Sequence, residues 1–435
     1  ERLIGTDELR QMNVRNVEDA VATQAGVVKT TDGLQIRGAR VYETEYLVDG
    51  ISAQDPLAGT GFGVNVQSSA IQSIHVGNAF AELQRQQAHL GSMVAQMTPA
   101  LWGIPAMRHE GACASSSLGV LSAMAEIEAG RYDCVLVMGV EEFKNTSGNV
   151  ASVNQNAAAW QGHEDIDCTF MWPAAFGLMA QEYEKRYGLD RKYLNRIAEI
   201  NYGNAKSNPL AQTRKWQFDA LSFTDDDEAN PIIEPGTRRQ DCGQITDGGC
   251  AIVLASAKFA QAYAAHRGQS LEKMARISGW GHRNAGLRLL DKIERSQGQN
   301  YVFPHVRDTI EDAWRRAGVS GIDAMSGIET HDCFTTTEYM AIDHLGLTAP
   351  GQSWQAVEDG TIEPGGRCPV NMSGGLIGCG HPVGATGTRM LWDASRQVTQ
   401  QAEACQIEGA QRIQTLNIGG SCATVVSFVV ETAAE

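Results

Sequence analysis

The fold class is decided by residues 114–142, which read "ASSSLGVLSAMAEIEAGRYDCVLVMGVEE". Small residues dominate positions 114–130 and a glycine closes the stretch, a pattern that predicts a closely packed helix. An apolar run with few charges, "CVLVMGVEE", follows at 134–142, as expected of a strand buried on both faces. A helix followed by a buried strand is the repeating unit of an α/β fold.

The same alternation continues toward the C-terminus. Residues 250–266, "CAIVLASAKFAQAYAAH", predict a strand and then a helix, and "ARISGWGH" begins a second series. Later strand candidates lie in "IETHDCF" and "QTLNIGGSCATVVSFVVE", with helices between them. We therefore predict an α/β protein with mixed, mainly parallel sheets in two similar halves, residues 73–268 and 269–435.

Residues 145–240 differ from this pattern. They are irregular and rich in Asn, Gln, Trp and Asp. We expect an inserted loop region there, with helices at 174–187 and 190–205.

Composition restricts the functional classes. The net charge of −16 argues against a nucleic-acid binder but leaves room for an anionic substrate held by a local basic patch. Ten scattered cysteines without CxxC spacing argue against a structural zinc site and predict reduced thiols in a cytoplasmic protein. No run of about twenty apolar residues is present, so we expect no membrane span. The chain opens with Glu-Arg, as expected of a fragment or a trimmed product.

Three glycine-flanked or polar motifs are candidates for chemistry. The first is "EGACASSS", in which Cys113 lies at the start of the predicted helix. Free N–H groups and the helix dipole stabilise a thiolate there and lower its pKa. Taken alone, the stretch is explained slightly better by an unreactive buried cysteine in a tight turn than by a reactive thiolate.

The second motif is "GCGHPVGATG", which contains His381. Glycines expose the backbone around the histidine and the proline stiffens the turn. A histidine so placed can act as a general base or donate to an oxyanion. The alternative, a histidine that only caps the following helix, does not account for the surrounding glycines and proline as well as a catalytic histidine does.

The third motif is "THDCFTTTEY", residues 330–339. His331 and Cys333 would point to the same side of an extended segment. A metal site would need further ligands, and we expect no metal. A second thiol near a first could move a carbon-bound proton. The alternative is that these residues only form the apolar end of a strand, an interpretation that is more plausible for Cys333 than for His331.

In combination, "CAS", "HDCF" and "GHPVGATG" occur in the order and at the separations of the thiolase family. The chain from about residue 73 to residue 435 resembles in particular the sterol-carrier-protein-2-type branch. Supporting stretches are "IHVGNAF", "VLVMGVEEF", "NPLAQTRKWQF", "TDGGCAIVLAS" and "LNIGGSCATVV". The resemblance implies a layered αβαβα fold.

The resemblance also implies roles for individual residues. Cys113 matches the acyl-accepting nucleophile, and His381 matches the histidine that activates it. Most thiolases carry their acid/base cysteine where this chain has Asn417. The "HDCF" branch implies Cys333 as the acid/base and His331 as the replacement for the asparagine that orients an oxyanion-hole water. The N–H groups of Cys113 and Gly419 would form a second oxyanion hole.

The implied activity is CoA-dependent cleavage of 3-ketoacyl-CoA or the reverse Claisen condensation, within lipid metabolism such as fatty acid β-oxidation. Coenzyme A would be a substrate rather than a resident cofactor, and the family forms homodimers or tetramers. Arg214 and Lys215 are candidate contacts for the CoA phosphates, although solvated loop charges explain them at least as well. Met171 and Trp172 are candidates for the acyl pocket or for the core of a loop.

Residues 1–72 do not fit a thiolase. The stretches "NVEDAVATQAGVV", "LQIRGARVYETEYLVDGI" and "SAIQSI" resemble the plug domain of TonB-dependent receptors, although the later sequence does not resemble a receptor's barrel strands. We expect a chimeric N-terminus; a divergent thiolase N-terminus is the alternative. If the family's first strand lies in the middle of the sheet, its loss would leave neighbouring edges unpaired.

Two rival functions remain open. A decarboxylating condensing enzyme of the ketoacyl-synthase type uses a Cys-His-His set, which Cys113, His331 and His381 could supply. A catalytically inactive fusion or binding module is the other. Cys333 is the residue that favours a thiolase.

Overall fold

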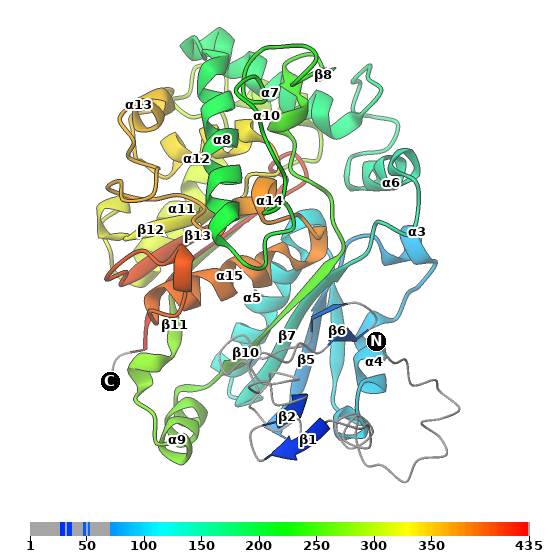
Figure 1. Ribbon diagram of the computed structural model, residues 1–435, viewed down its shortest axis with the longest axis vertical. Helices are drawn as coiled ribbons and strands as arrows, with labels where there is room; N and C mark the ends of the chain where they lie inside the picture. Colours follow the sequence, from blue (N-terminus) through cyan, green and yellow to red (C-terminus); the bar gives the residue numbers. More distant parts are fainter. Residues whose placement is uncertain (1–26, 31–32, 37–46, 49–50, 53–69, 434–435) are drawn as a thin grey trace. The chain divides into compact units, whose positions relative to one another are not determined.

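The computed structural model describes residues 27–30, 33–36, 47–48, 51–52 and 70–433 (Figure 1). The chain divides into two compact units, Glu1–Ala70 and Ile71–Glu435. In the first unit, β1 (Val27–Thr30) pairs antiparallel with β2 (Gly33–Ile36), and β3 (Leu47–Val48) pairs antiparallel with β4 (Ile51–Ser52). Most of the plug-like segment predicted for residues 1–72 lies outside the described residues.

The second unit contains two four-stranded sheets. The strand order of the first sheet is β10-β7-β5-β6. Its strands are β5 (Ser73–Gly77), β6 (Ala106–His109), β7 (Cys134–Glu141) and β10 (Gly248–Ala255). Strand β5 is parallel to both β6 and β7, whereas β10 runs antiparallel to β7. The apolar run predicted at 134–142 is therefore an interior strand, and alternate residues of β7 are fully buried.

The second sheet repeats three strands of this layout, with β12, β13 and β14 in the places of β5, β7 and β10. Its order is β11-β14-β13-β12, formed by β11 (Ala275–Asn284), β12 (Gly327–Thr330), β13 (Arg412–Gly419) and β14 (Thr424–Thr432). Strand β12 is parallel to β13, and β14 is antiparallel to β13, as β10 is to β7. Strand β11 then pairs antiparallel with the far edge of β14.

The two sheets differ at this edge. Among residues 70–433, no strand takes the place beside β10 that β11 takes beside β14. By the molecule's own repeat, a further strand of the first half would lie at the edge of the sheet beside β10, and not in the middle of the sheet.

Two helices separate the sheets. Figure 1 shows α5 (Ser115–Glu128) and α15 (Thr386–Val398) side by side in the centre of this unit. Small residues allow their close approach, because a Cβ on Gly387 would lie 2.2 Å from the hydroxyl oxygen of Ser117. Helix α11 (Pro304–Ala317) covers β11 and β14 on the outer face. This arrangement confirms the layered α/β fold.

The predicted loop region is more ordered than expected. It contains α6 (Gly148–Gln155), α7 (Met171–Tyr187), α8 (Arg191–Ser207) and the hairpin of β8 (Ile232–Glu234) and β9 (Thr237–Arg238). Helices α7 and α8 correspond to the two predicted helices. Their buried residues, such as Phe176, Met179 and Ile197, join the core of the second half around Tyr339. The region is thus partly a structural cover of that half.

The remaining helices complete the layers. They are α3 (Ala81–Arg85), α4 (Leu90–Met93), α9 (Ala257–Arg267), α10 (Leu289–Arg295), α12 (Thr335–His344), α13 (Ser353–Glu358) and α14 (Gly375–Gly378). The predicted division at residue 268 falls between α9 and β11. Within the described ranges, every helix is too short or too polar to cross a membrane.

Candidate active site

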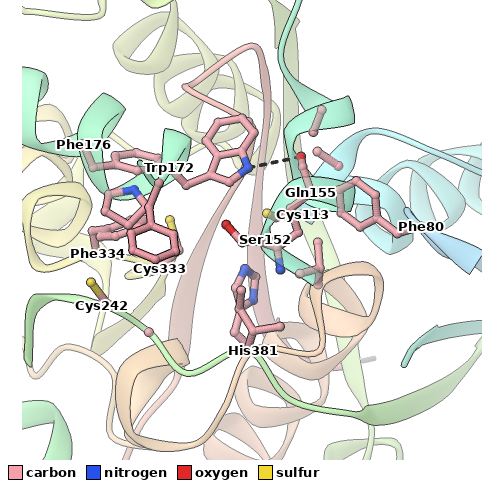
Figure 2. A pocket seen from close by; sticks show the side chains of 18 residues that line it. Phe80, Cys113, Ser152, Gln155, Trp172, Phe176, Cys242, Cys333, Phe334 and His381 are labelled. Carbon is pink, nitrogen blue, oxygen red and sulfur yellow. Dashed lines mark hydrogen bonds between the residues drawn. The ribbon is translucent and has the colours of Figure 1, made fainter. Parts of the chain in front are cut away.

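A cavity of about 150 Å³ brings the three sequence motifs together. Cys113, Cys333 and His381 all line it, and Figure 2 shows their side chains around one shared space. Most of the other lining residues are apolar: Phe80, Ala112, Ala158, Phe170, Trp172, Pro173, Phe176, Ile245, Phe334 and Val383. The site therefore combines a few reactive groups with an apolar wall, as binding sites for small molecules usually do.

Cys113 lies in a tight turn between β6 and α5. The preceding Ala112 has a φ of +50°, a left-handed conformation that costs a residue with a Cβ of order 1 kcal/mol or more. The Ser115 hydroxyl stabilises the turn by accepting from the Gly111 N–H at 3.1 Å and donating to the Ala112 carbonyl at 2.6 Å. The strained turn presents the thiol at the start of α5, as the sequence predicts.

The charge state of the resting site differs from the sequence-based expectation. Burial raises the pKa of the Cys113 thiol to about 12, against the opposing effect of a hydrogen bond from the Gly420 backbone N–H. Burial, with a smaller contribution from Arg389, lowers the pKa of His381 to about 3. Desolvation therefore outweighs the helix terminus, and a neutral thiol faces a neutral imidazole. Such an imidazole can accept the thiol proton when attack begins.

His381 is held by its own loop. Its Nδ1 lies 3.0 Å from the Thr386 hydroxyl, and its backbone N–H donates to the carbonyl of Gln244. The Cys113 sulfur and one ring nitrogen from each of His331 and His381 lie within 4.8 Å of one another. A Cys-His-His set of this size could also hold a metal ion. The predicted absence of a metal stays a prediction.

His331 is not part of the cavity lining, although one of its ring nitrogens lies within 4.8 Å of the Cys113 sulfur. It follows β12 directly, is fully buried and donates its backbone N–H to the Leu416 carbonyl at 2.8 Å. Its ring crosses the ring of His381 at 85°, with centroids 5.4 Å apart. Burial lowers the pKa of His331 well below its ordinary value, so the ring is neutral.

Cys333 forms part of the cavity wall beside Phe334. Its carbonyl accepts from the Gly243 N–H at 2.7 Å, and the next residue, Gln244, accepts from the His381 N–H, so this segment joins the "HDCF" segment to His381. Burial raises the pKa of its thiol well above the ordinary value. Cys242 is a third thiol in the lining, and nothing in the sequence around it indicated this position.

Asp332 couples two of the motifs. Its carboxylate accepts from the backbone N–H groups of Leu376 at 2.6 Å and Ile377 at 3.2 Å, five and four residues before His381. A Cβ on Gly375 would lie 2.2 Å from this carboxylate, and Gly375 has a φ of +61°. The spacing between His331, Cys333 and His381 therefore depends on a contact that sequence reasoning did not identify.

Glu338 forms a second buried acid beside Asp332. The Asn201 side-chain amide donates to Asp332 at 3.0 Å and to Glu338 at 2.6 Å, so the two carboxyl groups are neighbours. Asn371 also donates to Glu338 at 2.7 Å. Burial, then the charge of Asp332, raises the pKa of Glu338 to about 8, and burial raises that of Asp332 to about 6.

These carboxyl groups make stability depend on pH. An acid whose pKa is raised by folding binds its proton more tightly in the folded state, so the folded state is favoured at low pH. We expect the melting temperature to fall as the pH rises from about 4.5 through 8. In Glu338→Gln the fall should be shallower, because glutamine does not ionise. Differential scanning fluorimetry at several pH values measures it, and an equally steep fall in the variant would refute the assignment.

The other predicted site residues lie at different distances from the chemistry. Gly419 ends β13 and is not part of the cavity lining, whereas its neighbour Gly420 is. The role predicted for Gly419 stays a prediction. Arg214 and Lys215 are exposed and outside the lining. Their loop still reaches the site, because the Gln212 N–H donates to the carbonyl of Cys379, two residues before His381.

Three family models match parts of this chain. The thiolase N-terminal domain model matches residues 60–218, and the thiolase C-terminal domain-like model matches residues 289–432. The TonB-dependent receptor plug domain model matches residues 2–91 and so overlaps the first match over 60–91.

Curated relatives and solved structures are similar over most of the chain. An acetyl-CoA acetyltransferase of Methanothermobacter thermautotrophicus is 28% identical over 387 residues, which cover 87% of this chain and 94% of that protein. Human sterol carrier protein 2 is 25% identical over 83% of this chain and 64% of that protein. In structure, the Ltp2-ChsH2(DUF35) aldolase gives a TM-score of 0.65 at 18% identity, covering 85% of this chain and 89% of that chain. The Acat5 thiolase from Ascaris suum in complex with coenzyme A gives 0.56 at 15% identity, covering 85% and 90%.

The two family models together span both halves of the second unit and include all three motifs that meet at the cavity. The chain belongs to the thiolase family.

Proposed function

We propose that this protein is a thiolase-type acyltransferase that cleaves 3-ketoacyl-CoA with CoA, or condenses two acyl-CoA molecules in reverse. The observation that carries the proposal is that the thiols of Cys113 and Cys333 line the same cavity as His381. One thiol can hold the acyl group while the other moves a proton. Splitting a difficult carbon–carbon cleavage into two steps is the advantage of covalent catalysis.

In the first half-reaction, Cys113 attacks the 3-keto carbon and its proton passes to His381. The bond between C2 and C3 then breaks, and the electron pair stays on C2 as the enolate of acetyl-CoA. Cys333 protonates C2 and becomes a thiolate, and acetyl-CoA leaves. N–H groups near the oxygen atoms stabilise the charge that develops in each step.

In the second half-reaction, the thiol of CoA attacks the acyl group on Cys113. The CoA proton passes to the Cys333 thiolate, and His381 returns its proton to the departing Cys113. Both cysteines are then thiols again. The raised pKa of both thiols keeps them protonated in the resting enzyme, so Cys333 has a proton to give to C2.

A decarboxylating condensing enzyme is the rival, and the compact set of Cys113, His331 and His381 favours it. Two separate assays distinguish these functions, one with acetoacetyl-CoA and CoA and the other with a malonyl thioester. We expect acetyl-CoA to form by thiolysis in the first assay and no carbon dioxide to be released in the second. Turnover of the malonyl thioester without thiolysis would replace our proposal with the rival, and inactivity in both assays would favour a binding module.

The acyl group is limited in size by an aromatic wall. Phe176 stacks on Phe334 with ring centroids 4.5 Å apart, and Trp172 lies 6.4 Å from Phe176. The Trp172 indole is fixed by donating to the carbonyl of Gln155 at 3.1 Å, which Figure 2 marks. An apolar cavity of about 150 Å³ in another protein holds one benzene molecule. We propose acyl groups of about six carbons or fewer.

Trp172→Ala should therefore extend the range of chain lengths. We expect kcat/KM for a ten-carbon 3-ketoacyl-CoA to rise by about 10-fold while that for acetoacetyl-CoA changes little, since a few methylene groups gain about 1–3 kcal/mol of contact. A spectrophotometric thiolysis series from four to sixteen carbons measures the shift. Trp160→Ala is the control, because Trp160 is 47% exposed and outside the lining. An unchanged profile in Trp172→Ala would contradict the proposed limit.

We also propose that CoA enters past Arg214 and Lys215 and that two copies form a dimer along β6. Strand β6 ends its sheet, and large apolar side chains are exposed on and near it, including Met97, Trp102 and Met107. Exposed apolar clusters of this kind favour burial against a second copy. The predicted cytoplasmic location and a role in fatty acid β-oxidation remain predictions.

A further inference from the structure

Asn417 connects the nucleophile to His331. It lies in β13, is 1% exposed, and occupies the position at which most thiolases have a cysteine. Its side-chain nitrogen Nδ2 donates to the backbone carbonyl of Cys113 at 3.2 Å and lies 3.1 Å from Nδ1 of His331. Its oxygen Oδ1 accepts from the hydroxyl of Ser117 at 2.7 Å.

These contacts determine which way the amide faces. The carbonyl oxygen of Cys113 can only accept a hydrogen bond, so the amide nitrogen must face it. The same nitrogen faces Nδ1 of His331, and therefore Nδ1 accepts and carries no proton. In a neutral imidazole, the single proton is then on Nε2.

The Nε2 of His331 has no hydrogen-bond partner among the described residues, although it is fully buried. An unpaired buried N–H is costly and usually indicates a partner in another state of the protein. A ring nitrogen of His331 lies within 4.8 Å of both the Cys113 sulfur and a nitrogen of His381, so the ring lies beside the reacting atoms.

We propose that Asn417 is a positioning residue that fixes the tautomer of His331, so that the Nε2–H donates to the substrate oxygen on which negative charge develops. The inference rests on the proposed thiolase function. It assigns to Asn417 a role different from that of the cysteine it replaces. The amide directs a proton that stays on the neighbouring ring, instead of exchanging a proton with the substrate.

Two substitutions of similar size separate this role from a structural one. In Asn417→Asp, a carboxylate oxygen replaces the donor and accepts from Nδ1–H of His331. The tautomer then reverses and Nε2 loses its proton. In Asn417→Leu all three hydrogen bonds are lost, but the ring remains free to carry its proton on Nε2.

We expect Asn417→Asp to be the more damaging change at pH 8. Loss of one oxyanion donor lowers kcat by about 10²- to 10³-fold, whereas Asn417→Leu should lose about 10-fold or less. The KM for acetoacetyl-CoA should change little in either, since the bond strengthens only in the transition state. A purely structural role predicts the opposite order, because leucine removes more contacts.

The pH profile supplies a second readout. When His331 in Asn417→Asp binds a second proton, both ring nitrogens donate, so kcat should recover by about 10-fold or more as the pH falls toward 6. The parent should show no such rise. The ionisable groups near His331 are its neighbours Asp332 and Cys333, together with Cys113, His381 and Arg389. All of them are the same in the variant, so the carboxyl group that Asn417→Asp introduces is the one ionisable group by which variant and parent differ.

Asn204→Asp is the control, because Asn204 is a buried asparagine on α8 that donates to the carbonyl of Asn371 and does not contact His331. It should lower stability without changing the pH profile. Long-range ¹H–¹⁵N spectra of histidine-labelled protein, with His331 assigned from a His331→Gln variant, report the tautomer independently of activity. Protonated Nε2 in the parent and protonated Nδ1 in Asn417→Asp at pH 8 would support the inference. The reverse order of damage, or the same tautomer in both, would overturn it, whereas a parent without thiolysis would refute the proposed function instead.

Discussion

Cys113→Ala is expected to abolish thiolysis of acetoacetyl-CoA, with a loss in kcat on the order of 10⁶-fold, as when the nucleophile of a covalent enzyme is removed. The physical reason is that no acyl-enzyme can form, so the carbon–carbon bond would have to break in one step. The thiol is partly exposed in a cavity that also holds the candidate base His381, whereas other cysteines, such as Cys368, are buried elsewhere.

Two measurements check this expectation. Mass spectrometry of the protein mixed with acetoacetyl-CoA, but without CoA, should show an acetyl adduct on Cys113 in the parent and none in the variant. Cys368→Ala is the matched control, since Cys368 is a buried cysteine outside the cavity lining, and it should retain parental turnover. Acetylation at another cysteine, or substantial turnover by Cys113→Ala, would contradict the assignment of the nucleophile.

Cys333→Ala should give the second largest loss, about 10²- to 10⁴-fold in kcat, the usual contribution of a positioned general acid or base. Cys333 lies in the wall of the same cavity as Cys113, and Asn417 stands where most thiolases place a second cysteine. The loss should concern the proton at C2. Exchange of deuterium from solvent into the methyl group of acetyl-CoA should therefore slow with thiolysis, while transfer of the acyl group to Cys113 from a simple thioester remains.

Cys242→Ala tests whether another thiol could do the same work. Cys242 shares the cavity lining, but its thiol contacts the carbonyl of Arg238 at 3.4 Å. We expect kcat of Cys242→Ala to fall by less than about 10-fold, because the substitution changes the packing but leaves the proposed proton donor, Cys333, in place. If Cys333→Ala keeps parental exchange and Cys242→Ala loses it, then Cys242 is the acid/base and the role given to the "HDCF" motif is wrong.

Much of the fold could be predicted from the sequence because its signals are local. The run "CVLVMGVEE" has the composition of a buried strand and is β7, and the helices expected at 174–187 and 190–205 are α7 and α8 to within three residues at each end. The family prediction is confirmed by the two thiolase models. The motifs around Cys113 and His381 were visible because glycines flank both residues and a proline follows His381, whereas the motif at 330–339 was visible because it places His331, Asp332 and Cys333 side by side.

The rest depends on contacts between distant segments. The link between Asp332 and the N–H groups that follow Gly375 joins residues more than forty positions apart, and no local pattern indicates it. The raised pKa of Cys113 results from burial by segments distant in the sequence, whereas the sequence showed only the start of a helix. Cys242 and Gly420 line the cavity, but the sequence around each of them has no pattern that indicates a functional site.

The edge of the first sheet at β10 has a consequence for handling the protein in solution. Strand β10 reads "GGCAIVLA", carries no charge over eight residues, and has one edge without a strand partner among residues 70–433. Uncharged apolar edge strands are templates for further strands, and so they promote aggregation. A polypeptide consisting of the thiolase-like residues alone should therefore have a solubility limit set by this edge rather than by its net charge, and a single lysine introduced on β10 is the direct remedy.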